Sequence, residues 1–320
     1  MNKILIIGAG QLGSRHLQGA LQSTLQLSIT VVDPSSESLN VAKERAEQIT
    51  IVNSKSKVQY IQSLPSKESF DVCIIATSAP VRAKVTASLL AENKVCYIIF
   101  EKVLFQALHE YTEVAALLKK HNVISWVNCP RRLSPSYQQI KELLNADEPL
   151  SMKVSGSGWG MACNSIHFID LFSYLCSESN LQATESNLNA ELLESKRSGF
   201  YELTGKVKFM IGKHSLELEC TATDEVAIQV SVLSNSNTIK VDEIEGIINA
   251  TGTSLEQKFK HEVKYQSELT GLNIDEILNT ETSSLTPFKE SCQLHTPMIE
   301  LYLRHINNVL NKSLLACPIT

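Results

Sequence analysis

The sequence has no excess of positive charge and no long apolar run. Its 320 residues include 29 lysines and arginines against 34 aspartates and glutamates, a formal net charge of −5. This balance argues against nucleic acid or an anionic membrane surface as a partner. No apolar stretch approaches the roughly 18 residues of a membrane span. The short run after Lys3 lacks a signal peptide's cleavage site, so we interpret it as a first strand and expect a cytoplasmic protein.

Paired cysteine motifs are absent as well. The chain has eight cysteines, but none of them forms a C-x-x-C pair. Cys73 and Cys96 lie inside apolar runs, which is typical of buried thiols. The pattern therefore favours reduced cysteines over a disulfide framework, and it predicts no metal site.

The sequence also lacks internal repeats, low-complexity tracts and long linkers, and its length suits two domains of about 150 residues each. Residues 1–125 alternate apolar strands with helical patterns, which predicts an α/β, doubly wound parallel sheet that binds NAD(P). Residues 126–320 show period-2 alternation, which predicts an α+β domain with an open, mainly antiparallel sheet for substrate binding and oligomerisation. Whether a C-terminal helix at about 297–311 packs back on the first domain is left open.

The expected elements follow from apolar periodicity. In the first domain we expect strands over 4–7, 27–32, 70–77, 95–100 and 123–127, with a further strand at either 49–53 or 58–61. Helices are expected at about 35–48 and 108–121, and one is expected to start near Pro80. In the second domain we expect a helix through 168–175 and strands over 207–211, 216–220, 228–232, 239–241 and 259–265.

The most informative stretch is a glycine-rich turn between the first strand and the first helix. Gly8 allows a tight turn, Gly10 allows the backbone to approach a pyrophosphate, and Gly13 allows the helix to pack against the strand. The helix begins with Gln11 and Leu12, and its N-terminus favours a phosphate. We therefore predict that these five residues bind a dinucleotide.

An acidic residue supports the dinucleotide interpretation. Asp33 ends the second apolar run, twenty positions after Gly13, where a carboxylate accepts hydrogen bonds from the ribose hydroxyls. The alternative is an aspartate that only caps the next helix. Residues 34–37 include no lysine or arginine to receive a 2′-phosphate, so NAD is expected rather than NADP.

Two further stretches follow parallel strands at the edge where open α/β sheets bind ligands. Ala76, Thr77 and Ser78 come after one strand, and Glu101 and Lys102 come after the next. We predict that all five residues contact the cofactor, with Lys102 near the reacting centre. The alternative for Glu101 and Lys102 is a solvated pair beyond a strand end.

The second domain has a possible acid/base group of its own. Cys163, His167 and Asp170 are spaced four and three apart, so they share one helix face. An imidazole oriented by a carboxylate suits proton transfer near neutral pH. The alternative is a histidine with only structural hydrogen bonds. Arg131 and Arg132 either meet an anionic substrate or pair with nearby carboxylates.

Taken in chain order, these stretches resemble the motifs of one family, the Gfo/Idh/MocA oxidoreductases, which include inositol dehydrogenases and glucose–fructose oxidoreductases. The stretches are Gly8-x-Gly10-x-x-Gly13-x-x-His16, Glu101-Lys102, Arg131-Arg132-Leu133-Ser134-Pro135 and His167-x-x-Asp170. The resemblance implies that Lys102 and His167 are the catalytic pair. With them, Arg131, Asn164 and Asp170 are expected to bind the substrate.

The chain departs from the family pattern at four positions. Val103 replaces the proline of the Glu-Lys-Pro motif, and Pro130 stands where asparagine is usual. Cys163 replaces the first aspartate of the Asp-x-Gly-x-His-x-x-Asp motif, and Ser165 replaces its glycine. A thiol cannot replace a carboxylate, so proton transfer is expected to rest on Lys102 and His167.

We therefore predict an NAD(P)-dependent oxidoreductase that acts on a CH–OH group of a sugar, polyol or nucleotide sugar, with surface glycan biosynthesis as one interpretation. A non-catalytic dinucleotide sensor and an NAD-dependent glycosidase are the alternatives, because fold alone does not decide function. A homodimer or tetramer is expected through the outer face of the antiparallel sheet, where Met210, Ala222 and Ala227 make the surface only partly polar.

Overall fold

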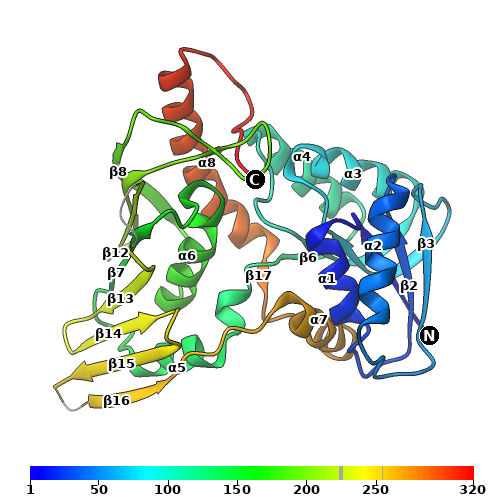
Figure 1. Ribbon diagram of the computed structural model, residues 1–320, viewed down its shortest axis with the longest axis horizontal. Coiled ribbons are helices and arrows are strands. Elements are labelled where there is room, and N and C mark those ends of the chain that lie inside the picture. Colours follow the sequence, from blue (N-terminus) through cyan, green and yellow to red (C-terminus); the bar gives the residue numbers. More distant parts are fainter. Residues whose placement is uncertain (223–225, 254) are drawn as a thin grey trace. The chain divides into compact units, whose positions relative to one another are not determined.

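The computed structural model describes residues 1–222, 226–253 and 255–320, which form two compact units (Figure 1). Unit 1 consists of residues 1–105, 109–128 and 264–289, and unit 2 of residues 106–108, 129–263 and 290–320. The sequence analysis divides the chain once, after residue 125, whereas residues 264–289 here join the first unit. As a boundary between independently folding domains, that division stays a prediction.

Unit 1 is built on a seven-stranded sheet of order β17-β6-β5-β4-β1-β2-β3, parallel except for β17 at one edge. The strands are β1 (Asn2–Ile7), β2 (Leu27–Val32), β3 (Lys57–Ile61), β4 (Ser69–Ile75), β5 (Lys94–Phe100), β6 (Ile124–Val127) and β17 (Thr286–Pro287). The strand order reverses between β4 and β1, which is where open α/β sheets bind ligands. The predicted doubly wound parallel sheet is confirmed, and β3 is the second of the two candidate strands.

Helices connect these strands by right-handed crossovers, so the helices toward β3 cover one face and those toward β6 the other. The connecting helices are α1 (Gln11–Ala20), α2 (Ser36–Glu47), α3 (Ala79–Glu92) and α4 (Leu108–Lys120), whereas α7 (Gln266–Thr280) precedes the antiparallel edge strand β17. Local signals start two of them: the Ser35 hydroxyl accepts the Ser38 N–H at α2, and Pro80 lies in the first turn of α3.

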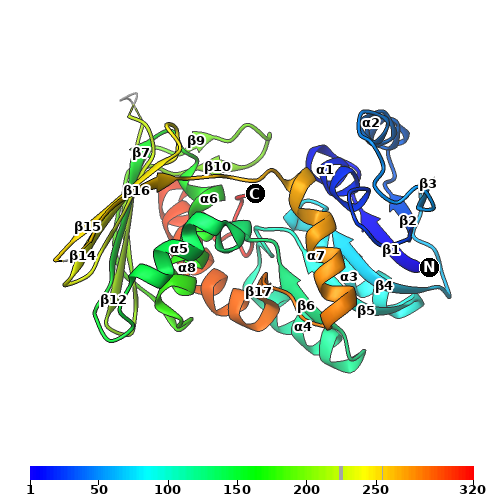
Figure 2. The ribbon, with the colours of Figure 1, turned by 90° about the horizontal axis from the view of Figure 1, so that it is seen from below.

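Helix α7 packs against α1 at very short range (Figure 2). A Cβ at Gly19 would lie 2.7 Å from the Cβ of Thr270, and a Cβ at Gly271 would lie 2.5 Å from the Gly19 carbonyl oxygen. The two glycines therefore permit the close contact. The strand expected at 259–265 is wrong in its second half, because β16 ends at Lys260 and Tyr265 is the N-cap of α7.

Unit 2 contains an eight-stranded sheet of order β16-β15-β14-β13-β7-β12-β11-β8, in which only the neighbours β7 and β12 run parallel. The strands are β7 (Ser151–Ser157), β8 (Leu181–Leu188), β11 (Gly205–Ile211), β12 (His214–Thr221), β13 (Gln229–Leu233), β14 (Asn237–Asp242), β15 (Ile247–Gly252) and β16 (Leu255–Lys260). The predicted open, mainly antiparallel sheet is confirmed.

The other elements of unit 2 are mostly helical. They are the 3-10 helix η1 (Pro130–Leu133), α5 (Pro135–Leu143), α6 (Met161–Cys176), the paired short strands β9 (Leu193–Glu194) and β10 (Tyr201–Glu202), and α8 (Phe288–Leu310). Helix α6 packs on β12, and its Ser165 hydroxyl lies 2.6 Å from the Tyr302 hydroxyl of α8.

The outer face of the unit 2 sheet is more ionic than the sequence analysis expects. Lys153 Nζ lies 3.0 Å from Glu217 and 2.8 Å from Glu219, and Lys206 bridges the same two carboxylates at 3.3 and 3.5 Å. Alternate positions on adjacent strands face the same side, so the cationic and acidic side chains form a ladder across β7, β12 and β11.

A buried histidine couples this fold to pH. The Leu150 N–H donates to His214 Nδ1 at 3.0 Å, which requires that nitrogen to carry no proton. Burial lowers the pKa of His214. Between the lowered folded value and the unfolded value near 6.5, the unfolded chain binds more protons, so stability is lost as pH falls through that window.

We therefore expect His214→Gln to make the melting temperature less sensitive to pH. The glutamine amide oxygen accepts the Leu150 N–H without titrating. The variant therefore avoids the loss of unfolding free energy that the parent suffers at low pH, which is on the order of one hydrogen bond, about 0.5–1.5 kcal/mol. Thermal unfolding at about pH 7.5 and about pH 5.5 measures this difference. His109→Gln, at an exposed position, serves as the control. Equal pH sensitivity in the parent and His214→Gln would contradict the assignment.

Candidate functional site

The glycine turn after β1 depends on two close backbone contacts. Gly8 has a φ of +98°, and a Cβ there would lie 2.9 Å from the backbone carbon of Ala76, after β4. A Cβ at Gly13 would lie 1.7 Å from the Gly8 carbonyl oxygen. Any side chain at either position would therefore push the first turn of α1 or the β4 loop away.

Gly10 differs from the other two glycines because it has space around it. No atom of the described residues lies within 4 Å of a Cβ built at Gly10, and its φ of −66° suits any amino acid. Gly10 is the N-cap of α1 and provides no side-chain cap, so the N–H groups of the first turn have no cap of that kind and can bind an anion. Gln11 is exposed and Leu12 half-buried at the same turn. The open cradle at a helix N-terminus fits a pyrophosphate.

Asp33 lies beside the glycine turn. Its carboxylate accepts the Ala9 N–H at 2.7 Å through Oδ2 and the Ser35 N–H at 2.9 Å through Oδ1. The carboxylate thus holds the loops after β1 and β2 together. The capping alternative is not supported at α2, because Ser35 is the N-cap of that helix.

The structure adds a cation that the sequence analysis missed. Arg45, in the last turn of α2, donates to Gln11 Oε1 and to the Ser14 hydroxyl, both at 2.6 Å. A cation near a helix N-terminus is unfavourable by itself, because that end already carries partial positive charge. An anion bound there reverses the sign, so Arg45 fits a pyrophosphate site. No sequence motif marks this arginine, which reaches α1 only in the folded chain.

Glu101 is the centre of a buried polar network at the end of β5. Its carboxylate lies 2.9 Å from His16 Nε2 and accepts a hydrogen bond from the Asn128 side chain, which in turn donates to Gln266 Oε1 at 2.7 Å. His16 Nδ1 lies 2.9 Å from the Thr270 hydroxyl. Side chains from α1 and the end of β6 therefore meet at the Glu101 carboxylate, and side chains of α7 contact both of them.

This network excludes the solvated-pair alternative for Glu101, which is only 2% exposed. Lys102, the next residue, is half-buried. On the neighbouring strand end, Ala76 and Thr77 are half-buried and Ser78 is exposed, and the Thr77 hydroxyl is buried without a hydrogen-bond partner among the described residues. Unit 1 thus brings all of its predicted cofactor residues to the carboxyl edge of β1, β2, β4 and β5.

In unit 2, α6 positions the predicted acid/base group. The helix begins after Gly160, whose φ of +73° is left-handed, and Asn164 Nδ2 donates to the Trp159 carbonyl at 2.8 Å. His167 is half-buried one turn further along. The Ala162 N–H donates to Glu202 Oε2 at 2.9 Å, so a carboxylate from β10 caps the helix.

Glu202 is a second residue that the sequence analysis missed. A Cβ at Gly160 would lie 3.0 Å from Cys163 Sγ and 3.4 Å from Glu202 Oε1, so both side chains surround this turn. A carboxylate is therefore present near Cys163, although it comes from a residue 39 positions later in the sequence. Nothing in the local sequence pattern identifies it.

Asp170 lies in a buried ion pair. Its carboxylate accepts two hydrogen bonds from Arg132, at 2.9 Å from Nε and 2.8 Å from NH2, and the same NH2 lies 2.9 Å from Glu290. Burial alone would lower the pKa of Arg132, but the two carboxylates raise it above its usual value. This pairing leaves the Asp170 carboxylate to anchor α6 against η1.

Arg131 also follows the carboxylate-pairing alternative. Its guanidinium donates through both terminal nitrogens to Glu243, with 3.0 Å from NH2 to Oε2, and it lies over the Phe168 ring at 4.1 Å from the centroid. Tyr137 donates to Glu243 at 3.0 Å. Burial lowers the pKa of Arg131, but Tyr137 and Glu243 raise it by more.

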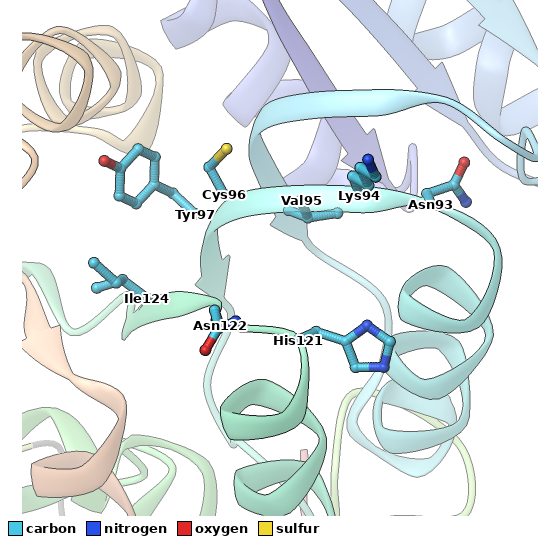
Figure 3. A pocket seen from close by; sticks show the side chains of 8 residues that line it. All are labelled: Asn93, Lys94, Val95, Cys96, Tyr97, His121, Asn122 and Ile124. Atoms are coloured by element: carbon cyan, nitrogen blue, oxygen red, sulfur yellow. The ribbon is translucent and has the colours of Figure 1, made fainter.

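A cavity of about 400 Å³ lies elsewhere in unit 1 (Figure 3). It is at the amino-terminal ends of β5 and β6, the opposite edge of the sheet from Glu101 and Asn128. The residues that line it are Asn93, Lys94, Val95, Cys96, Tyr97, His121, Asn122 and Ile124. None of them is a predicted site residue.

Among residues 1–222, 226–253 and 255–320, no group of three or more histidine, cysteine, aspartate or glutamate side chains could hold a metal ion. Within the same ranges, no helix is long and apolar enough to span a membrane.

The fold and the glycine turn define a nucleotide-binding oxidoreductase domain. Residues 2–129 match the family model described as "Oxidoreductase family, NAD-binding Rossmann fold". This match confirms the predicted resemblance to the Gfo/Idh/MocA family and the predicted NAD cofactor. No curated protein matches the chain.

Solved structures share the fold of the whole chain. An oxidoreductase from Agrobacterium radiobacter, in complex with NAD+, L-tartaric acid and magnesium, is 12% identical with a TM-score of 0.70, covering 93% of this chain and 94% of that one. UDP-N-acetylglucosamine 3-dehydrogenase GnnA from Acidithiobacillus ferrooxidans is 12% identical with a TM-score of 0.68, covering 94% and 96%. A super-repressor mutant of Gal80p from Saccharomyces cerevisiae is 15% identical with a TM-score of 0.70, covering 96% and 97%.

Two glycine variants test the cofactor cradle. We expect Gly10→Ala to leave the melting temperature nearly unchanged, because its Cβ enters empty space, but to weaken NADH binding about tenfold or more by filling the pyrophosphate site. Gly13→Ala should instead destabilise the fold by about 1–3 kcal/mol, because its Cβ overlaps the Gly8 carbonyl. Thermal unfolding and NADH fluorescence titration separate the two effects. Unchanged NADH affinity in Gly10→Ala would place the pyrophosphate elsewhere.

Proposed function

We propose that the protein is an NAD-dependent oxidoreductase that transfers a hydride between nicotinamide and a hydroxyl or carbonyl carbon of a sugar, polyol or nucleotide sugar. The observation that carries the proposal is the carboxyl edge of unit 1. There the glycine turn, Asp33 and the buried Glu101 network stand at the ends of neighbouring strands, directly before Lys102. The buried network fixes the position of Lys102 beside the dinucleotide site. This placement favours a catalytic role for Lys102 over that of a solvated surface charge.

In this proposal, unit 1 binds the two halves of the cofactor with different groups. The N–H groups at the start of α1 and the Arg45 guanidinium hold the pyrophosphate. Asp33 accepts hydrogen bonds from the adenosine ribose. Thr77 and Lys102, after β4 and β5, serve the nicotinamide half.

Lys102 and His167 are the proposed catalytic residues. The Lys102 ammonium donates a hydrogen bond to the substrate oxygen and stabilises the negative charge that develops on it. The His167 imidazole takes or returns the proton, because a histidine side chain can act as both proton acceptor and proton donor. Asn164 is three residues before His167 on the same face of α6, where its amide can bind a neighbouring substrate hydroxyl.

Glu202 and Asp170 are proposed to support His167 from either end of its helix segment. Glu202 caps the first turn and carries the negative charge that Cys163 does not. Asp170 fixes α6 through Arg132. Both residues act through the position of α6, so they are positioning residues in this proposal.

The paired charges suit the uncharged sugar or polyol part of the substrate. Glu243 neutralises Arg131 and Arg132 neutralises Asp170, so these predicted substrate residues offer little net charge. A polyhydroxyl group needs hydrogen bonds and stacking more than a counter-charge. Arg131 over Phe168 provides a planar surface of that kind.

A dinucleotide sensor remains the second candidate. Cys163 and Val103 depart from the catalytic motifs, and the chain shares its fold with a super-repressor mutant of Gal80p. A sensor needs the cofactor cradle but not the proton-transfer pair. The catalytic test below distinguishes the two.

A homodimer or tetramer through the outer face of the unit 2 sheet also stays part of the proposal. The ladder on this face carries both positive and negative side chains, namely Lys153, Lys206, Glu217 and Glu219. Such a surface can pair with a second copy of itself across a two-fold axis. Static light scattering at micromolar concentration tests it, and a single monomeric mass would contradict it.

We expect His167→Ala and Lys102→Met each to lower turnover by about 10²–10⁴-fold, because each removes a positioned proton donor or acceptor. NADH affinity should change little in His167→Ala. The assay follows nicotinamide absorbance with a panel of sugars, polyols and nucleotide sugars. Cys163→Ala should be mild and Glu202→Gln more damaging, since the carboxylate rather than the thiol is proposed to support the helix.

The parent protein provides the critical control for this prediction. Binding of NADH without turnover on any member of the panel would favour the sensor. If a substrate turns over and the His167 and Lys102 variants match the parent, the assigned roles are wrong.

NADH should bind more tightly than NADPH by at least about tenfold, because the Asp33 carboxylate repels a 2′-phosphate. Asp33→Asn keeps an oxygen acceptor for the Ala9 N–H but removes the negative charge. The variant should therefore show a smaller difference between its affinities for NADH and NADPH. Fluorescence titration of both cofactors measures the ratio. Equal or tighter NADPH binding by the parent would overturn the assignment and point to Arg45 as a phosphate partner.

A further inference from the structure

Unit 1 contains a buried arginine that the proposed function does not use. Arg82, on α3, is 2% exposed and is among the largest fully buried side chains of the protein. Arginine is seldom buried unless its donors are used, because an unpaired buried charge is costly. The groups that Arg82 contacts therefore indicate what it does.

The Arg82 guanidinium joins two loops at the carboxyl edge of the sheet. One terminal nitrogen donates to the carbonyl oxygens of Val103 and Leu104, with 2.8 Å to Leu104, and the other donates to the Thr77 carbonyl oxygen. Thr77 follows β4, and Val103 and Leu104 follow β5, two strands that are neighbours in the sheet.

These carbonyls lie in segments without regular secondary structure, so no helix or ladder satisfies them. A guanidinium is planar and holds its N–H donors in a fixed fork, so it sets the relative position of the carbonyls that it binds. A lysine ammonium is a point donor on a flexible stem and cannot span both loops in the same way. Arg82 thus fixes the Thr77 loop against the residues that directly follow Lys102.

We propose that Arg82 is the positioning residue of the nicotinamide half of the cofactor site. Arg82 acts through the backbone on the Thr77–Ser78 and Lys102 loops. The proposal rests on the proposed function, which assigns those loops to the nicotinamide half. The adenosine and pyrophosphate half depends on other groups: Asp33, the first turn of α1 and Arg45. Arg82 and Arg45 therefore act on different halves of the dinucleotide site, Arg82 through the backbone and Arg45 beside the first turn of α1.

The division between the halves gives a test by ligand binding. ADP-ribose lacks only the nicotinamide, so it reports the adenosine half, whereas NADH reports both halves. We expect Arg82→Lys to weaken NADH binding about tenfold and ADP-ribose binding less than about twofold, since small displacements of positioning groups have large effects on what they hold. Isothermal titration calorimetry measures both affinities.

Arg45→Lys is the matched control, because it makes the same substitution at the arginine of α2 that contacts the first turn of α1. It should alter the affinities for NADH and ADP-ribose by the same factor. Guanidinium ion added to Arg82→Ala should restore NADH binding and leave ADP-ribose binding unchanged. Arg82→Lys keeps the buried positive charge, so it decides the test if Arg82→Ala does not fold.

The outcomes separate positioning from a structural role. Selective loss of NADH affinity supports the proposal. Equal loss of both ligands, or no loss of either, overturns it, because a merely structural arginine has no reason to distinguish the two halves. Failure of the proposed function has a different signature, which is a parent protein that binds NADH and turns over no substrate while the ratio of the two affinities still responds to Arg82.

Discussion

The carboxylate of Glu101 is the interaction on which the arrangement of unit 1 depends. It is buried, and the polar side chains around it, including His16, Asn128 and Gln266, come from positions far apart in the sequence. A buried carboxylate without such partners would be expensive, so the network forms only when α1, β5, the end of β6 and α7 have all reached their places. Lys102 follows directly, and its position is therefore a consequence of that assembly.

Close backbone contacts set the rest of the cofactor cradle. Gly8 and Gly13 leave no room for a side chain, whereas Gly10 leaves a space that a pyrophosphate can fill. Gly19 and Gly271 allow α7 to approach α1, which brings Gln266 to the Glu101 network. The same residue type thus serves three purposes, and only the tertiary contacts distinguish them.

Charges in unit 2 are largely cancelled in pairs. Arg132 with Asp170 and Arg131 with Glu243 bind through bidentate contacts, a geometry in which arginine holds a carboxylate firmly. Such pairs are better at fixing orientation than at adding stability, because desolvation offsets much of their attraction. The arginines of the Arg131–Pro135 motif therefore act on the shape of unit 2 and on the position of α6. Removing Arg132 would leave the buried Asp170 carboxylate without this partner, whereas removing Asp170 would leave Arg132 paired with Glu290 alone.

The sequence by itself determined the nucleotide-binding fold, its glycine turn and Asp33, because these depend on short spacings and on strand–turn–helix order. It also identified Glu101 and the two-sheet architecture, since apolar periodicity is a local property. It missed α7 and mistook Tyr265 for part of a strand, because a helix held by glycine contacts has little periodicity of its own. Arg45, Arg82 and Glu202 were found only in the folded chain. Apart from Thr77, which is five residues from Arg82, their partners lie 21 to 40 residues away, so only tertiary structure brings them together.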